Sequence, residues 1–192
     1  NDNRRQGARV GLVYDISQNQ AFSIQTILNA TQLYNNFYSD VSFQRATDFT
    51  IGTNTTEWTR KPVQVSTNAM YTIKTDTLGS VLKLIADYTS GTRKEVNVFA
   101  ARSKDHTLDD DVINRTPNKT EILSIQADHT QMFPHALQFK AGLKYAGIRR
   151  DNDVRIDNII NGNIVPNLGA SNHFIYDEQL AMAYATAEKT IK

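Results

Sequence analysis

The feature that most constrains this 192-residue sequence is the recurrence of apolar residues at every second position, in one segment after another. In the clearest segment the odd positions are apolar or aromatic: Leu137, Phe139, Ala141, Leu143 and Tyr145. Side chains of a β-strand alternate between its two faces, whereas the apolar positions of a helix recur every three to four residues. The sequence therefore predicts strands with one apolar and one polar face.

Seven segments follow this pattern, and they predict an all-β fold, an antiparallel up-and-down meander of about seven strands. Their apolar positions start at Ala8, Phe22, Val63, Leu82, Leu123, Leu137 and Leu180. In the last segment we expect Leu180, Met182 and Tyr184 to share a face, opposite Gln179 and several alanines.

The connections between these segments alternate strictly in length. Short turns are expected at residues 17–19, 74–79 and 132–134, and long loops at about 35–57, 91–120 and 147–176. Loops longer than about 12–15 residues are uncommon in compact domains. Outer-membrane barrels, in contrast, have short periplasmic turns and long extracellular loops. We therefore expect the strands to be part of a transmembrane β-barrel.

The aromatic residues agree with this interpretation. Three lie at strand ends beside long loops, and three at ends beside short turns: Tyr34, Tyr88 and Tyr145, and Tyr14, Phe22 and Tyr71. Such positions predict two aromatic girdles at the membrane interfaces. The alternative is that these rings form the core of a soluble β-sandwich. No apolar run approaches the length of a spanning helix, but barrel strands leave only a weak hydropathy trace.

The polar positions of the strands carry charged residues that we expect to line a barrel lumen. We expect these residues to have structural roles more than ligand contacts. The lumen-facing set is Lys83, Asp87, Asp128, Lys140 and Lys144. Opposite charges on neighbouring strands could form cross-strand ladders. A turn near Phe133 would place Asp128 beside Gln138 and Gln126 beside Lys140.

The first long loop is rich in aromatic residues, and loops are where binding residues concentrate. Its candidate ligand-binding residues are Phe37, Tyr38, Phe43 and Trp58. These rings could stack on a sugar or a siderophore, or they could pack the loops against each other.

Several functional classes lack support in the sequence. There is no cysteine, and a net charge of +1 with interspersed signs argues against nucleic-acid binding. Glycine-rich phosphate loops, nucleophile elbows and zinc-protease motifs are absent, so we expect no catalytic residues and no cofactor. Residues 109–111 are three consecutive aspartates, but their spacing lacks the EF-hand pattern and we expect no metal there.

Four stretches of the sequence resemble the barrel of the Bacteroidetes-type outer membrane β-barrel family, whose members are similar to TonB-dependent receptors. They are residues 141–145 (AGLKY), 151–153 (DND), 171–178 (SNHFIYDE) and 183–186 (AYAT). The resemblance implies a longer parent protein, with an N-terminal plug domain and about twenty-two strands. Residues 1–192 would then be a partial barrel, without the plug domain and the remaining strands.

The resemblance implies nutrient uptake across the outer membrane of a Gram-negative bacterium. The expected partners are outer-membrane lipid, the TonB system through the plug domain, and a small-molecule or glycan ligand such as a metal chelate or a vitamin. The isolated fragment could also self-associate through its open edges. The alternative is a soluble β-sandwich that serves as a binding or adhesion module, and a barrel enzyme ranks third for want of a nucleophile motif.

Overall fold

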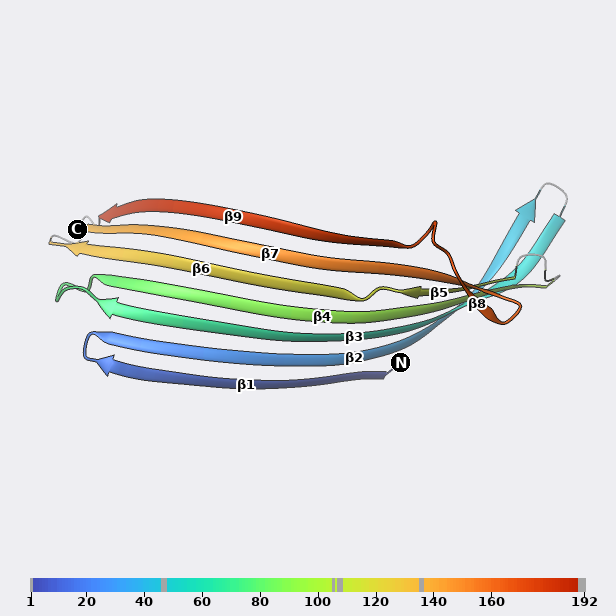
Figure 1. Ribbon diagram of the computed structural model, residues 1–192, viewed down its shortest axis with the longest axis horizontal. Coiled ribbons are helices and arrows are strands. Elements are labelled where there is room, and N and C mark those ends of the chain that lie inside the picture. The colour runs from blue at the N-terminus through green and yellow to red at the C-terminus, as the bar shows by residue number, and fades with distance from the viewer. Residues whose placement is uncertain (1, 46–47, 105, 107–108, 135–136, 190–192) are drawn as a thin grey trace.

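The computed structural model describes residues 2–45, 48–104, 106, 109–134 and 137–189, and these residues form one antiparallel β-sheet (Figure 1). Its strands are β1 (Asp2–Ser17), β2 (Gln20–Arg45), β3 (Asp48–Lys74), β4 (Val81–Ser103), β5 (Asp110–Arg115), β6 (Asn118–Phe133), β7 (Leu137–Ile160), β8 (Asn163–Pro166) and β9 (Asn172–Lys189). No helix within these residues is long and apolar enough to cross a membrane.

The sheet is a meander, because each long strand pairs antiparallel with the next long strand along the chain. β5 and β6 occupy successive parts of the same place between β4 and β7. They are separated at Thr116 and Pro117, where proline has no N–H to donate to the ladder. The prediction of an all-β antiparallel meander is thus confirmed, with nine strands in the described residues where about seven were expected.

The two additional strands lie inside regions that the sequence analysis assigned to long loops. β5 falls within residues 91–120, and β8 falls within residues 147–176, where it forms a short hairpin with β7. The expected loop at 35–57 is also wrong in detail, since β2 and β3 stay paired from Gln20 and Ile73 out to Arg45 and Asp48. Continued pairing satisfies the backbone N–H and C=O groups that an irregular loop would leave to water.

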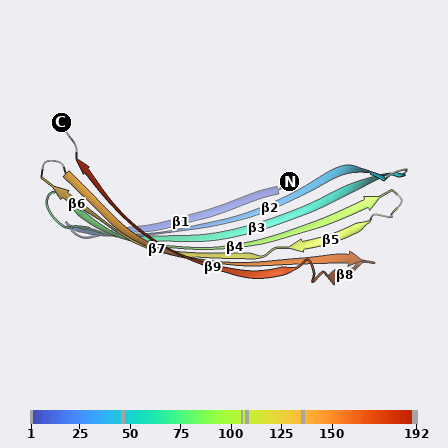
Figure 2. The same ribbon diagram turned by 90° about the horizontal axis from the view of Figure 1, so that it is seen from above.

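The two ends of the sheet nevertheless differ in how far the strands extend. The connections β1–β2, β3–β4 and β6–β7 are brief and gather at one end, on the left of Figure 1. At the other end β2, β3, β4 and β7 extend past the neighbouring strands. Figure 2 shows that the sheet curves along its length and forms a single layer.

One face of this layer is apolar and exposed, and we call it the apolar face. Val10 is 74% exposed, Leu143 is 65% exposed, and Ile125 is 57% exposed. Among the described residues, the buried hydrophobic side chains are only Ile113 and Ala146. A soluble β-sandwich would cover this face with a second sheet. No second sheet is present in the part of the chain that the structure describes, so the sandwich alternative lacks its defining feature.

The opposite face, which we call the polar face, includes three apolar or aromatic side chains of β9. Tyr184 pairs with Gly142, Met182 with Lys144, and Leu180 with Ala146. Directly paired residues project to the same side of a sheet. Leu180, Met182 and Tyr184 therefore share a face as expected, but this face is the polar face, although their side chains are apolar or aromatic.

The alanines of β9 continue the apolar face instead. Ala181, Ala183 and Ala185 pair with Tyr145, Leu143 and Ala141. Both faces of this strand carry apolar residues, so hydrophobicity alone did not show which of them continues the apolar face of the sheet. The cross-strand register brings the large Tyr184 ring opposite a glycine, and this register decides which side chains of β9 lie on the polar face.

The expected register across the β6–β7 turn is also wrong. Asp128 pairs with Gly142 and Gln126 pairs with Lys144, not with Gln138 and Lys140. The difference arises because β6 runs through Phe133, which pairs with Leu137, so the turn comes later than its aromatic residue suggested.

Candidate functional site

The five charged residues expected to line a lumen share the polar face. Lys83 is the direct cross-strand partner of Asp128, and Asp87 is the partner of Ser124. Lys144 pairs with Gln126, and Lys140 pairs with Thr130. The oppositely charged Lys83 and Asp128 are thus neighbours on adjacent strands, the arrangement that stabilises a sheet across its ladder.

The carboxylates of this set are already hydrogen-bonded within the sheet. Asn68 Nδ2 donates to Asp87 Oδ1 at 2.6 Å, and Ser124 Oγ donates to Asp87 Oδ2 at 3.2 Å. Asp128 accepts from Gln126 Nε2 at 2.7 Å and from the Tyr184 hydroxyl at 2.9 Å. These bonds give Asp87 and Asp128 a structural role on the polar face.

The candidate aromatic residues do not gather into one cluster. Phe37 pairs with Thr56, whereas Tyr38 pairs with Thr55, so these consecutive side chains point to opposite faces of the sheet. Their rings are 58% and 69% exposed. Phe37 lies on the polar face, two positions along β2 from the cross-strand partner of Trp58. The side chain of Phe43 lies outside the described residues, although its backbone pairs with Thr50.

Trp58 sits in a polar cluster that the sequence analysis did not find. Its Nε1 donates to Glu95 Oε1 at 2.9 Å, and the Arg60 guanidinium lies 5.9 Å from its ring centroid. Glu95 Oε2 is also 3.8 Å from Arg60 Nε and 3.5 Å from Arg93 Nε. One carboxylate therefore faces two guanidinium groups and one indole on the polar face.

Only the cross-strand register shows this cluster. Arg60 is the direct partner of Glu95, and Trp58 is the partner of Asn97. The sequence signal that could have identified it is the continued alternation of Trp58, Arg60 and Pro62 in β3 against Arg93, Glu95 and Asn97 in β4. That signal was missed because residues 93–97 were assigned to a long loop and the strand before them was expected to start only at Val63.

Two open hollows indent the polar face on either side of Pro62. The hollow nearer β1 has a volume of about 480 Å³, and its lining includes Arg5, Gly7, Asn29 and Arg60. The other has a volume of about 280 Å³, and its lining includes Gln64, Gly91, Arg93 and Asn118. Each hollow contains a glycine, whose missing side chain leaves the space free, and each is bordered by arginine.

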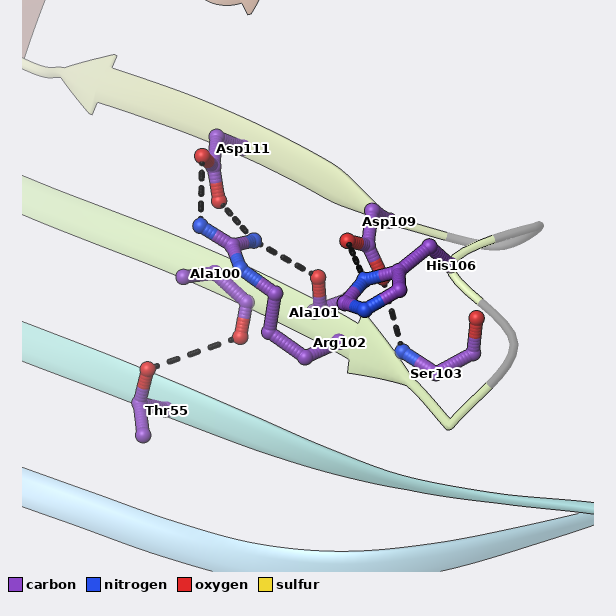
Figure 3. A network of polar contacts seen from close by, with 8 residues as sticks. All are labelled: Thr55, Ala100, Ala101, Arg102, Ser103, His106, Asp109 and Asp111. Atoms are coloured by element: carbon purple, nitrogen blue, oxygen red, sulfur yellow. Dashed lines mark hydrogen bonds and ion pairs between the residues drawn. The ribbon is translucent and has the colours of Figure 1, made fainter.

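A second polar network closes the tip of β4 and β5 (Figure 3). Arg102 donates two hydrogen bonds to the Asp111 carboxylate, of which the bond from Nη2 to Oδ2 measures 2.8 Å. His106 Nδ1 lies 2.9 Å from Asp109 Oδ2, and the Ser103 N–H donates to Asp109 Oδ1 at 2.8 Å. The contact with His106, followed by that N–H, holds the pKa of Asp109 below its ordinary value of 3.8.

These contacts use two of the three consecutive aspartates in turn stabilisation. Arg102 neutralises Asp111, and Asp109 accepts a hydrogen bond from the N–H of Ser103 at the end of β4. No group of three or more histidine, aspartate or glutamate side chains placed to hold a metal occurs within the described ranges. The network at the tip of β4 and β5 therefore has a structural role, in which it stabilises the hairpin that these strands form.

A third network lies at the short-turn end, between the β3–β4 turn and β6. Asp76 Oδ1 accepts from the backbone N–H groups of Leu78 and Ser80, each at 2.9 Å. Ser80 Oγ donates to Asp76 Oδ2 and accepts from the Met132 N–H at 2.8 Å. Gln131 Nε2 donates to the same hydroxyl at 3.0 Å. The bond from the Ser80 hydroxyl is the largest cause that lowers the pKa of Asp76 from 3.8.

The polar face, the exposed apolar face and the two unlike ends can be compared with known folds. Among solved structures, the chain is similar to the ferric citrate transporter FecA in its unliganded form, with a TM-score of 0.51 and 10% identity. It is also similar to the ferric-catecholate import receptor Fiu from E. coli K12 in an open form, with a TM-score of 0.51 and 12% identity. Identities this low show a shared fold alone.

The chain is much shorter than these two proteins. The match covers 99% of this chain and 25% of the FecA chain, and 96% of this chain and 32% of the Fiu chain. The chain thus spans about a quarter to a third of the receptors whose fold it shares.

Comparison at the level of sequence gives the family. No curated protein matches the chain. A family model described as the outer membrane protein beta-barrel family matches residues 73–192, which is more than half of the chain. With its antiparallel sheet and uncovered apolar face, this chain belongs to the outer membrane protein β-barrel family, and its location is the outer membrane.

Proposed function

We propose that the chain is part of the barrel of a TonB-dependent receptor that imports a nutrient across the outer membrane. The observation that carries this proposal is a single curved sheet with an uncovered apolar face, a polar face, and long strand extensions at one end only. Its similarity in fold to FecA and Fiu supports the same reading. Residues 1–192 would form one partial-barrel unit, and further strands and a plug domain would belong to the whole protein.

In this proposal the apolar face contacts outer-membrane lipid and the polar face lines the lumen. A bilayer core offers no hydrogen-bond partners, so charged side chains belong on the side where water or other protein groups can reach them. Lys83, Asp87, Asp128, Lys140 and Lys144 would then be lumen residues. Their hydrogen bonds within the sheet support a structural role for the two aspartates.

The long extensions would face the cell exterior and contribute to ligand capture. We include Phe37, Tyr38, Phe43 and Trp58 in the proposed binding region, and the shared polar face of Phe37 and Trp58 supports those two most directly. The ligand would be a metal chelate, a vitamin or a glycan. Its passage would follow rearrangement of a plug domain that contacts TonB, as in the Bacteroidetes-type receptors that the sequence resembles.

This function requires binding and movement but no covalent chemistry, and we infer that the chain is not an enzyme. Asp87 and Asp128 on the polar face support this inference, because hydrogen bonds within the sheet occupy their carboxylates. A general acid or base needs instead a carboxyl group that can reach a bound substrate.

Single-cysteine labelling of the intact receptor would test the orientation of the faces. The chain contains no cysteine, so every thiol within it would be an introduced one. In membranes, Leu143→Cys should react with a lipid-soluble maleimide only, and Lys144→Cys, its neighbour on the opposite face, with a water-soluble one. Equal reaction of both with the water-soluble reagent would contradict a lipid-facing apolar surface.

The same approach tests which end faces outward. In whole cells an impermeant maleimide should label Leu168→Cys, beyond β8, and should not label Leu78→Cys, in the β3–β4 turn. Leu168 is 83% exposed and Leu78 is 58% exposed, so access to the side chain does not by itself separate the two. Uptake that is lost when TonB is deleted would then establish transport, and uptake that persists would contradict it.

A further inference from the structure

We propose that the polar face between β1 and β6 binds a small anion bearing carboxylate or phosphate groups, with Arg5, Arg60 and Arg93 as its cationic ligands. This inference rests on the proposed receptor function and names the chemical class of its ligand. We call the three arginines, together with the two hollows beside Pro62, the arginine site.

The charge on this part of the polar face is unbalanced. Across the cross-strand levels from Arg9 to Arg60, the polar face carries five arginines and two glutamates: Arg5, Arg9, Arg60, Arg93, Arg150, Glu95 and Glu178. Toward the short-turn end, in contrast, Asp15, Asp87 and Asp128 accompany the lysines of the same face. A surface with an excess of one charge attracts and concentrates ions of the opposite charge.

The arginines are also incompletely paired. Arg60 and Arg93 share one carboxylate, at 3.8 and 3.5 Å from their Nε atoms to Glu95 Oε2, which is longer than a hydrogen bond. Both Nε atoms are shielded from solvent, and neither has a hydrogen-bond acceptor among the described residues. A buried donor without an acceptor is costly, so a built arrangement of two such donors calls for an acceptor from elsewhere.

Glu95 cannot supply that acceptor to both arginines. Its Oε1 accepts from Trp58 Nε1 at 2.9 Å, which fixes the orientation of the carboxylate. One negative charge between two guanidinium groups leaves an excess positive charge at this point. The Trp58 contact thus holds Glu95 in place as a spacer between the arginines, and an added oxyanion would complete the pairing.

The hollows provide room for such an ion. Arg5 and Arg60 border the hollow of about 480 Å³, and Arg93 borders the hollow of about 280 Å³ on the other side of Pro62. Volumes of this order suit a small organic anion more than a single halide ion. Guanidinium groups bind carboxylate and phosphate oxygens through paired N–H donors, which is the geometry these ligands need.

The test is anion binding by the intact receptor, purified in detergent and followed by titration calorimetry. The probes are citrate for carboxylates, pyrophosphate for phosphates, and maltotriose as an uncharged comparison. We expect at least one anion to bind, more weakly as salt concentration rises, and maltotriose not to compete. Arg60→Gln and Arg93→Gln should each weaken binding by about tenfold, because each removes a charge-assisted hydrogen bond.

Matched variants keep the test specific. Arg149 and its cross-strand partner Glu121 lie on the face opposite to the arginine site. Arg149→Gln therefore removes an arginine of the same sheet and should leave the affinity within about twofold. Arg60→Lys keeps the charge but loses the planar fork, and it should fall between wild type and Arg60→Gln. Thermal unfolding of each variant without ligand shows whether the receptor remains folded.

Three results would overturn the inference. The first is the absence of binding by either anion, and the second is an affinity that Arg60→Gln and Arg93→Gln leave unchanged. The third is a loss of thermal stability in these variants with unaltered anion binding, which would mean that acidic groups elsewhere in the receptor pair with the arginines. If TonB-dependent uptake persists in any of these cases, the proposed function stands and only the anion site fails.

Discussion

The ring of Tyr184 on β9 lies against Gly142, its direct cross-strand partner on β7. From there the Tyr184 hydroxyl reaches across β7 and donates a hydrogen bond to Asp128 on β6, at 2.9 Å. A Cβ atom placed on Gly142 would overlap both the Tyr184 ring and the Asp128 carboxylate. The missing side chain of one glycine therefore allows three strands to be tied together on the polar face.

Gly142→Ala should lower the stability of the intact receptor by about 1–3 kcal/mol, since the Tyr184 ring would have to leave its place. Gly147→Ala is the matched control, because Gly147 lies on the same strand, faces the other way and has no atom within 4 Å of an added Cβ. The control should be neutral or slightly stabilising. Thermal unfolding in detergent measures both, and equal melting temperatures for the two variants would contradict the proposed role of Gly142.

Ser80→Ala should destabilise the short-turn end. Ser80 is fully buried, and its hydroxyl accepts from the Met132 N–H and from Gln131 Nε2. Leaving that backbone N–H without an acceptor costs about 1–3 kcal/mol. Thr77→Ala, an exposed residue of the same turn, serves as control and should change stability by less than about 0.5 kcal/mol. Hydrogen exchange at the Met132 amide should accelerate in the serine variant alone.

The same turn should weaken in acid. The pKa of Asp76 is lowered from 3.8 in the folded chain, chiefly by the Ser80 hydroxyl, so the ionised carboxylate favours folding. This contribution is complete above the unfolded pKa and is lost as the pH falls through the folded pKa. The difference in melting temperature between wild type and Asp76→Asn should be constant above about pH 5 and shrink below about pH 4. A difference that grows on acidification would mean that the pKa is raised instead.

Lys61 and Lys94 are direct cross-strand partners, and both are exposed. Like charges placed opposite each other destabilise a sheet, and opposite charges contribute about 0.2–1 kcal/mol. Lys61→Glu and Lys94→Glu should therefore each raise the melting temperature in low salt. The double variant restores a like-charged pair and should lose the gain. If the two single effects simply add, or if high salt does not reduce them, direct repulsion between these residues is not their cause.

Local alternation was sufficient to predict most of this architecture. Leu143 and Lys144 were assigned to opposite faces, and the structure has them so, because the two-residue period is a property of each strand alone. The difference between the two ends of the sheet could also be read along the chain, although segments expected to be long loops are largely extensions of the strands. What failed was the distinction between loop and strand beyond the aromatic residues near Tyr34, where hydropathy loses its contrast while backbone pairing continues.

The tertiary structure decided everything that depends on register. Trp58 and Glu95, 37 residues apart, meet because β3 and β4 pair well past the apolar stretch. The outward side of β9 was ambiguous in sequence, since its alanines and its larger apolar residues alternate; the space above Gly142 settled it. A strand carries its own two faces in its sequence, but which side chains meet across the ladder depends on how neighbouring strands are aligned, and a shift of a single residue would reverse every contact.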